Sequence, residues 1–97
     1  MNRLPPQSVG DVLRNLLEET SLQARMDELR AAGLWDKIVG RQIASQTGKP
    51  QVKNGLMYVP VANPVLRNEL YMTRSRIREI INTNFGKEII KEIKFTS

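Results

Sequence analysis

The residues best suited to chemistry in this chain are arginines, spaced so that one helix would present them together. Arg67, Arg74 and Arg78 fall within about 40° of one another at about 100° per residue, with Tyr71 beside them. Guanidinium groups at this spacing would meet successive phosphates, and a tyrosine ring offers a surface on which a base can stack. The stripe is also compatible with arginine stems that cover the core margin, or with contact to an acidic protein surface.

Two lysines form a second candidate site. Lys49 and Lys53 share one side of a predicted strand that leads into a hairpin turn. Lysines on an edge strand commonly hinder strand-to-strand aggregation, which is one interpretation of this pair. The alternative is a basic sheet face that includes Tyr58 together with Lys87, Lys91 and Lys94. We therefore predict a nucleic-acid contact made by Arg67, Tyr71, Arg74, Arg78, Lys49 and Lys53.

Positive charge is concentrated in the C-terminal two thirds of the chain. The 97 residues carry 15 Lys and Arg against 10 Asp and Glu, a net charge of +5. Residues 1–32 hold four arginines and five acids, so their net charge is −1. Residues 33–97 hold eleven Lys and Arg and five acids, so their net charge is +6. An anionic partner such as a nucleic acid would be drawn to this second segment.

The composition excludes several classes of enzyme. The chain has no cysteine and no histidine, and hence no disulfide, thiolate nucleophile, ordinary zinc site or imidazole base. The Gly-x-x-x-x-Gly-Lys phosphate loop of ATPases is absent as well. No apolar run resembles a signal peptide or is long enough to cross a membrane. We predict a cytoplasmic protein that is not an enzyme and has no metal, no cofactor and no membrane partner.

The periodicity of apolar residues predicts one α/β domain, of the α+β kind, over residues 8–97, after a flexible tail at residues 1–7. Helices are expected at residues 9–19, 20–32, 34–46 and 64–85, and strands at residues 49–53, 56–62 and 88–96. The order α-α-α-β-β-α-β predicts a small three-stranded mixed sheet that helices cover on one face.

Local signals mark the ends of these elements. Thr20 and Gln23 have the spacing of a capping box and would open the second helix, whose buried side is expected to carry Leu22, Met26 and Leu29. The third helix contains a glycine, Gly40, which would allow close packing against a neighbour. Asn54-Gly55 is a strong hairpin signal, Asn63-Pro64 would start the long helix, and Gly86 would end it.

The expected core combines helix and strand positions. The long helix would bury a face made of Leu66, Leu70, Thr73, Ile77, Ile80, Ile81 and Asn84. The strands would turn inward Met57, Val59, Val61, Ile89, Ile93 and Phe95, and the single tryptophan, Trp35, is expected in the core. Pro60 has no amide proton, so its strand must lie at an edge or turn Pro60 away from its partner. Lys91 falls on the inward side, which indicates a bulge or an edge position.

Three segments resemble the DciA-like family, formerly a domain of unknown function. They are Trp-Asp-Lys-Ile-Val-Gly at 35–40 with Ile43-Ala44 after it, the Asn54-Gly55 hairpin, and Val-Ala-Asn-Pro-Val-Leu-Arg-Asn-Glu-Leu at 61–70. The resemblance extends from about Ser8 to Phe95. It implies a KH-like domain in a bacterial protein that binds the replicative helicase DnaB and assists its loading on single-stranded DNA.

Two features depart from related proteins. KH domains that bind nucleic acid clamp its backbone with a Gly-x-x-Gly loop, and no two of the six glycines here are three positions apart. Other family members carry a basic, flexible extension beside this domain, which residues 1–97 do not include. We therefore expect weak contact with single-stranded DNA. The alternatives are a protein-interaction adaptor without DNA binding, monomeric or homodimeric, and a KH-like RNA-binding protein.

Overall fold

A computed structural model describes residues 9–97, including all of their side chains except those of residues 11 and 13–20. The predicted tail at residues 1–7 lies outside the described residues. The elements are α1 (Val9–Gly33), α2 (Trp35–Val39), α3 (Arg41–Ala44), β1 (Gln51–Lys53), β2 (Leu56–Pro60), α4 (Pro64–Met72), α5 (Arg74–Phe85) and β3 (Glu92–Thr96). No helix in residues 9–97 has the length and apolar character needed to cross a membrane.

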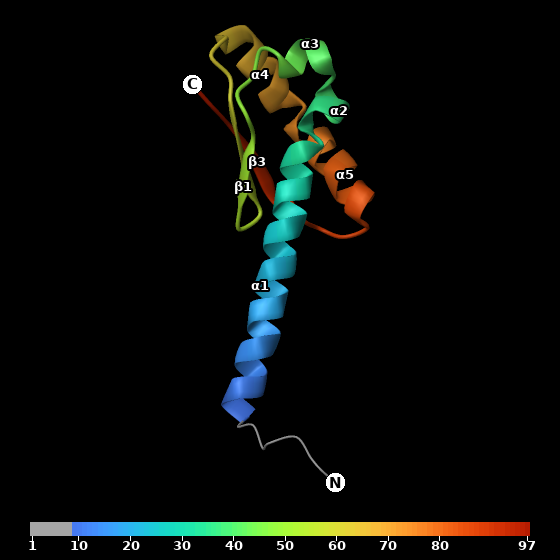
Figure 1. Ribbon diagram of the computed structural model, residues 1–97. Helices are drawn as coiled ribbons and strands as arrows, with labels where there is room; N and C mark the ends of the chain where they lie inside the picture. Colours follow the sequence, from blue (N-terminus) through green and yellow to red (C-terminus); the bar gives the residue numbers. More distant parts are fainter. Residues whose placement is uncertain (1–8) are drawn as a thin grey trace.

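Helix α1 is continuous, so the prediction of two helices that meet at Thr20 is wrong. Residues 11–32 contain neither glycine nor proline, and the capping-box spacing of Thr20 and Gln23 does not interrupt a helix by itself. The N-terminal part of α1 extends well beyond the sheet and the other helices (Figure 1). The C-terminal part packs against β1 and α2.

The buried side of α1 is not the predicted one. Leu22, Met26 and Leu29 are exposed, whereas Asp27 and Ala31 are buried. The regular spacing of the three apolar residues identifies a common helix face correctly, but that face is turned to solvent. Spacing alone does not say which side of a helix the rest of the chain will cover.

Gly40 separates two short helices where one helix over residues 34–46 is predicted. Its φ of 89° lies in a region that side chains with a Cβ rarely adopt. The expected close packing is wrong, because nothing lies within 4 Å of the place where a Cβ would stand. Glycine is needed here for the backbone turn between α2 and α3.

The sheet has the order β1-β2-β3, with β1 and β2 antiparallel and β2 and β3 parallel. The predicted mixed sheet of three strands is confirmed. Asn54 and Gly55 form the hairpin turn with φ values of 53° and 82°, as their types predict. The amide of Gly55 donates a hydrogen bond of 3.1 Å to Oε2 of Glu28, so α1 also holds the turn in place.

Strand β2 is central, and Pro60 lies two residues beyond Tyr58, which is opposite Gln51, the first residue of β1. The Pro60 carbonyl accepts a hydrogen bond from the amide of Gly48, on the side away from β3. The missing amide proton of Pro60 therefore costs no bond to β3. Strand β3 begins at Glu92 rather than at residue 88, and Lys91 lies exposed in the bend before this edge strand.

The core lies between one face of the sheet and the helices. Its buried apolar side chains are Ala31, Trp35, Met57, Val59, Val61, Leu70, Ile77, Ile81, Ile90 and Ile93. The indole nitrogen of Trp35 donates a hydrogen bond of 3.0 Å to the hydroxyl of Thr47, which satisfies its one polar atom. The other sheet face, which carries Tyr58 and Lys94, is open, so the predicted coverage of one face is confirmed. The fold class is α+β, and the KH-like assignment stays a prediction.

The long helix predicted over residues 64–85 is divided in two at Thr73. Its start is confirmed, because the Asn63 side chain accepts hydrogen bonds from the amides of Val65 and Leu66. Its end is confirmed by Gly86, which adopts the left-handed conformation. Three side chains of the predicted buried face are exposed: Thr73, which lies in the turn itself, and Ile80 and Asn84, which lie in the second half.

Asn82 joins α5 to the segment that leads into β3. Its Oδ1 accepts hydrogen bonds of 2.9 and 2.8 Å from the amides of Ile89 and Ile90. Its Nδ2 donates a bond of 2.9 Å to the carbonyl of Ile90. One side chain thus satisfies three main-chain groups in a partly buried segment without regular structure.

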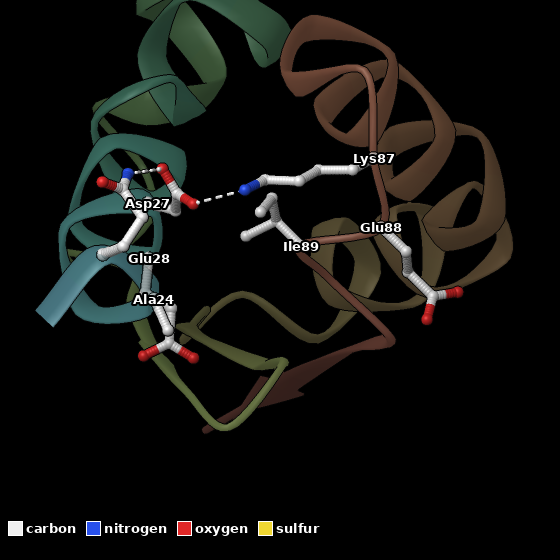
Figure 2. Close-up of a pocket in the computed structure, with 7 residues that line it drawn as sticks. Ala24, Asp27, Glu28, Lys87, Glu88 and Ile89 are labelled. Atoms are coloured by element: carbon white, nitrogen blue, oxygen red, sulfur yellow. Dashed lines mark hydrogen bonds and ion pairs between the residues drawn. The ribbon is translucent and has the colours of Figure 1, made fainter. Parts of the chain in front are cut away.

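A buried carboxylate ties α1 to the loop after α5. Asp27 is only 4% exposed, and its Oδ2 lies 3.0 Å from Nζ of Lys87 (Figure 2). Its Oδ1 accepts a hydrogen bond of 3.1 Å from Gln23 and lies 3.6 Å from Nη1 of Arg30. The hydrogen bond from Lys87 is the main reason why the pKa of Asp27 lies below its usual value, although burial acts in the opposite direction.

The Asp27–Lys87 pair predicts an acid-dependent stability. A carboxyl group with a lowered pKa in the folded state stabilises the fold above its unfolded pKa of about 4, and this stabilisation is lost as pH falls through the folded pKa. We expect Lys87→Met to destabilise the protein at pH 7 and to weaken the fall in unfolding free energy below about pH 4. Urea denaturation from pH 7 to pH 2 measures this, with Asp36→Asn as an exposed control. Equal pH profiles for the wild type and Lys87→Met would contradict the assignment.

Asn82 offers a test of the α5–β3 connection. Removing its side chain leaves partly buried main-chain groups without partners, at a cost of about 2 kcal/mol. We expect Asn82→Ala to lower the unfolding free energy by that amount. Asn84→Ala is the control, because exposed Asn84 makes a single hydrogen bond of 3.3 Å to Ile80 and its loss should cost under about 0.5 kcal/mol. Equal costs in the two variants would refute the role given to Asn82.

Candidate nucleic-acid interface

The four predicted residues on α4 and α5 lie along the outer edge of β3. Both helices contact β3, whose outer edge has no neighbour among the described strands. Arg67 and Tyr71 belong to α4, and Arg74 and Arg78 belong to α5. The turn at Thr73 lies between the two pairs, so the single straight stripe expected from the sequence is bent. We call these four residues the arginine row.

The α4 half of the row surrounds a surface hollow. Arg67 is half-buried, and its Nη1 donates a hydrogen bond of 2.8 Å to the carbonyl of Val61. This bond fixes the guanidinium at the end of β2. The hollow is lined by Pro64, Arg67, Asn68, Tyr71 and Phe95. Aromatic rings next to a guanidinium are the groups with which proteins hold a base and its neighbouring phosphate.

Arg74 joins the two halves of the row. Its guanidinium carbon lies 3.9 Å from the centre of the Tyr71 ring, which is the geometry of a cation–π contact. Its Nη1 also donates a hydrogen bond of 2.7 Å to the Tyr71 carbonyl. Since Tyr71 remains 52% exposed, the Arg74 contact leaves much of the residue accessible to a partner.

Arg78 completes the row beside the start of β3. Its Nη1 lies within hydrogen-bond distance, 3.3 Å, of the Lys91 carbonyl. A small hollow at this end is lined by Arg74, Ser75, Arg78, Lys91, Glu92 and Ile93. A guanidinium group has five N–H donors, so a bond to one carbonyl orients each arginine and leaves most of its donors available.

The positive charge of the row is not cancelled by ion pairs. Among the described side chains, ion pairs within 4.0 Å join Asp27 to Arg30 and Lys87, and none includes an arginine of the row. Glu92 lines the hollow at Arg78 and is the acid that borders the row. The described side chains of the domain contain no group of three acidic residues that could hold a metal ion. The row is suited to binding an anion.

Lys49 and Lys53 do not join the arginine row. Lys53 ends β1, at the opposite edge of the sheet from β3, and Lys49 lies in the loop before β1 rather than in a strand. Two strand spacings, about 10 Å, separate β1 from β3. The six predicted residues therefore occupy two surfaces. Lys87 is also removed from the alternative basic sheet face, because it pairs with Asp27 on the helical side.

Sequence reasoning missed the polar contacts that hold α1 against the rest of the domain. Gln23 and Arg30, at helical spacing from Asp27, are a local signal that a carboxylate is held there. Nothing in the sequence pairs Asp27 with Lys87, or Glu28 with the hairpin turn, because these contacts join distant parts of the chain. The breaks at Gly40 and Thr73 are local changes of backbone conformation, which the helical periodicity of apolar residues did not reveal.

Comparisons with known proteins give a consistent result. The family model described as "Dna[CI] antecedent, DciA" matches residues 8–95. A UPF0232 protein of Mycolicibacterium paratuberculosis is 24% identical over 91 residues, which cover 94% of this chain and 50% of that protein. A UPF0232 protein of Mycobacterium leprae is 25% identical, with 94% and 48% covered. One from the recF-gyrB intergenic region of Mycolicibacterium smegmatis is 26% identical, with 92% and 46% covered.

The chain thus spans about half the length of the curated relatives that it matches. The family model, by contrast, begins one residue before α1 and ends within β3, so it includes nearly every element of the fold. It also includes the whole arginine row. On this match, the chain belongs to the DciA family.

Proposed function

We propose that this domain binds single-stranded DNA along the arginine row and acts without catalysis. The observation that carries the proposal is the row itself: three guanidinium groups and an exposed tyrosine follow one sheet edge, and none of the three is in a described ion pair. Guanidinium groups neutralise phosphates, and a tyrosine accepts a stacked base only when that base is unpaired. A single strand fits this combination better than a duplex.

We further propose that the domain contacts a replicative helicase of the DnaB type and assists its loading on the strand. Membership of the DciA family supports this proposal, since the family resemblance implies such a partner. The arginine row would hold the single strand while another surface of the domain holds the helicase. Binding of RNA instead of DNA is the competing possibility for the row, and titration with RNA and DNA of equal length separates the two.

Removing the arginines should change the salt dependence of DNA binding in a predictable way. Each phosphate neutralised contributes about −0.7 to the slope of log affinity against log salt for a single strand. We expect Arg67→Ala/Arg74→Ala/Arg78→Ala to reduce the steepness of that slope by about 2, as measured by fluorescence anisotropy with a labelled oligo(dT). Because the variant loses the bonds from Arg67 to Val61 and from Arg78 to Lys91, its stability should fall, and thermal unfolding followed by circular dichroism checks that it is folded at the assay temperature.

The matched control for this experiment replaces exposed cations elsewhere. Lys37, Arg41 and Arg76 are all exposed and lie outside the row. Their triple replacement by alanine removes the same net charge but should leave most of the slope intact. If both triple variants change the slope equally, binding depends on the total charge and the arginine row has no special part in it.

Helicase binding should not require DNA. We expect the purified domain to retain the purified helicase in a pull-down after nuclease treatment, at about 0.5 M salt, where contacts through phosphates are strongly weakened. The arginine-row variant should retain the helicase as well. Loss of the helicase on nuclease treatment would mean that DNA bridges the two proteins.

A further inference from the structure

Helix α1 presents an apolar stripe to solvent. Leu22, Met26 and Leu29 are 61%, 47% and 73% exposed and follow one another at spacings of four and three residues. This spacing places them on one face of the helix, in the pattern with which helices pack against each other. Single exposed apolar residues are ordinary, but an aligned set on one helix face is typical of a protein-interaction surface. We call these three residues the apolar stripe.

The stripe continues into a groove between α1 and β1. Leu29 lines this groove together with Ala32 of α1 and Val52 of β1, and the charged residues of the groove are Arg25, Glu28 and Lys53. Its apolar side chains come from both elements, so the groove extends the stripe across to the sheet edge. This edge of the sheet is formed by β1. The opposite edge is formed by β3, along which the arginine row lies.

The lining of the groove holds two cations and one acid. Arg25 and Lys53 are exposed, and neither takes part in an ion pair with a described side chain. The one acid of the groove, Glu28, accepts the hydrogen bond from the amide of Gly55. An apolar surface between Arg25 and Lys53 is complementary to a segment that has apolar residues on one face and carboxylates beside them.

We infer that the apolar stripe and the α1–β1 groove dock an amphipathic helix of a protein partner, apolar on one face and acidic at its margins. The inference rests on the proposed function, because it assigns the protein partner to this surface and the single strand to the arginine row. The two partners would then occupy opposite edges of the sheet and could be bound together.

The charges argue against the two other occupants. A symmetric contact between two copies through the stripe would bring Arg25 of one copy near Arg25 of the other, because Arg25 is adjacent to Met26 in the middle of the stripe. Nucleic acid is disfavoured because the three stripe residues are aliphatic or thioether side chains that offer phosphate no donor.

The test compares three double variants for binding to the purified replicative helicase by isothermal titration calorimetry. We expect Leu22→Ser/Leu29→Ser to weaken binding at least about tenfold, as loss of central apolar anchors does. Val65→Ser/Met72→Ser is the matched control, since these residues on α4 are 69% and 74% exposed, and it should change affinity less than about twofold. Arg25→Glu/Lys53→Glu should also weaken binding, because it removes the complementary charge.

Separate outcomes distinguish the inference from the proposed function. If the wild-type domain does not bind the helicase, the proposed partner is wrong. If it binds and both serine variants bind equally well, the helicase uses another surface and the inference is overturned. If sedimentation shows a wild-type dimer that Leu22→Ser/Leu29→Ser dissociates, a second copy occupies the stripe, which also overturns it. Oligo(dT) affinity should be unchanged in Leu22→Ser/Leu29→Ser, and a loss there would place DNA on this surface instead.

Discussion

Main-chain carbonyls at the ends of the small sheet need hydrogen-bond donors, and long side chains from α4 and α5 supply them. Arg67 donates to Val61, Arg78 to Lys91, and Asn82 to Ile90. Carbonyls near a sheet end that lack strand partners would otherwise need water or remain unsatisfied. Two of these donors are arginines, so the contacts that complete the sheet also fix cations along its edge. The arginine row is therefore part of the architecture as well as a candidate binding surface.

The sequence predicted those features that depend on a few neighbouring residues. The turn at Asn54-Gly55, the cap at Asn63 and the stop at Gly86 are each decided by local backbone geometry, and all three are confirmed. The alternation in β2 correctly placed Met57, Val59 and Val61 in the core. The side of α1 that is buried, with Asp27 and Ala31 rather than Leu22, Met26 and Leu29, depends on how distant segments pack, which local periodicity does not report.

The candidate site was predicted only in part, because helical spacing is a local feature and the order of the strands is not. Helical spacing grouped Arg67, Tyr71, Arg74 and Arg78, and the structure keeps them along one edge even though their helix is divided. The spacing of residues in the sequence could not show that Lys53 lies at the other edge, because strand order is a property of the whole sheet. The same limit hid the apolar stripe of α1, since the pattern of Leu22, Met26 and Leu29 is equally compatible with a buried face. A domain with distinct surfaces at its two sheet edges could hold a single strand and a protein partner at once.

Mapping the contact residue by residue tests the central claim most directly. In an NMR titration of the 15N-labelled domain with oligo(dT), we predict the largest shift changes at the amides of α4 and α5 that carry Arg67, Tyr71, Arg74 and Arg78, and at neighbouring residues of β3. Residues of β1 and of the apolar stripe should change little. Shift changes centred on Lys53 and Tyr58, or spread evenly over the surface, would contradict the assignment of the single strand to the arginine row.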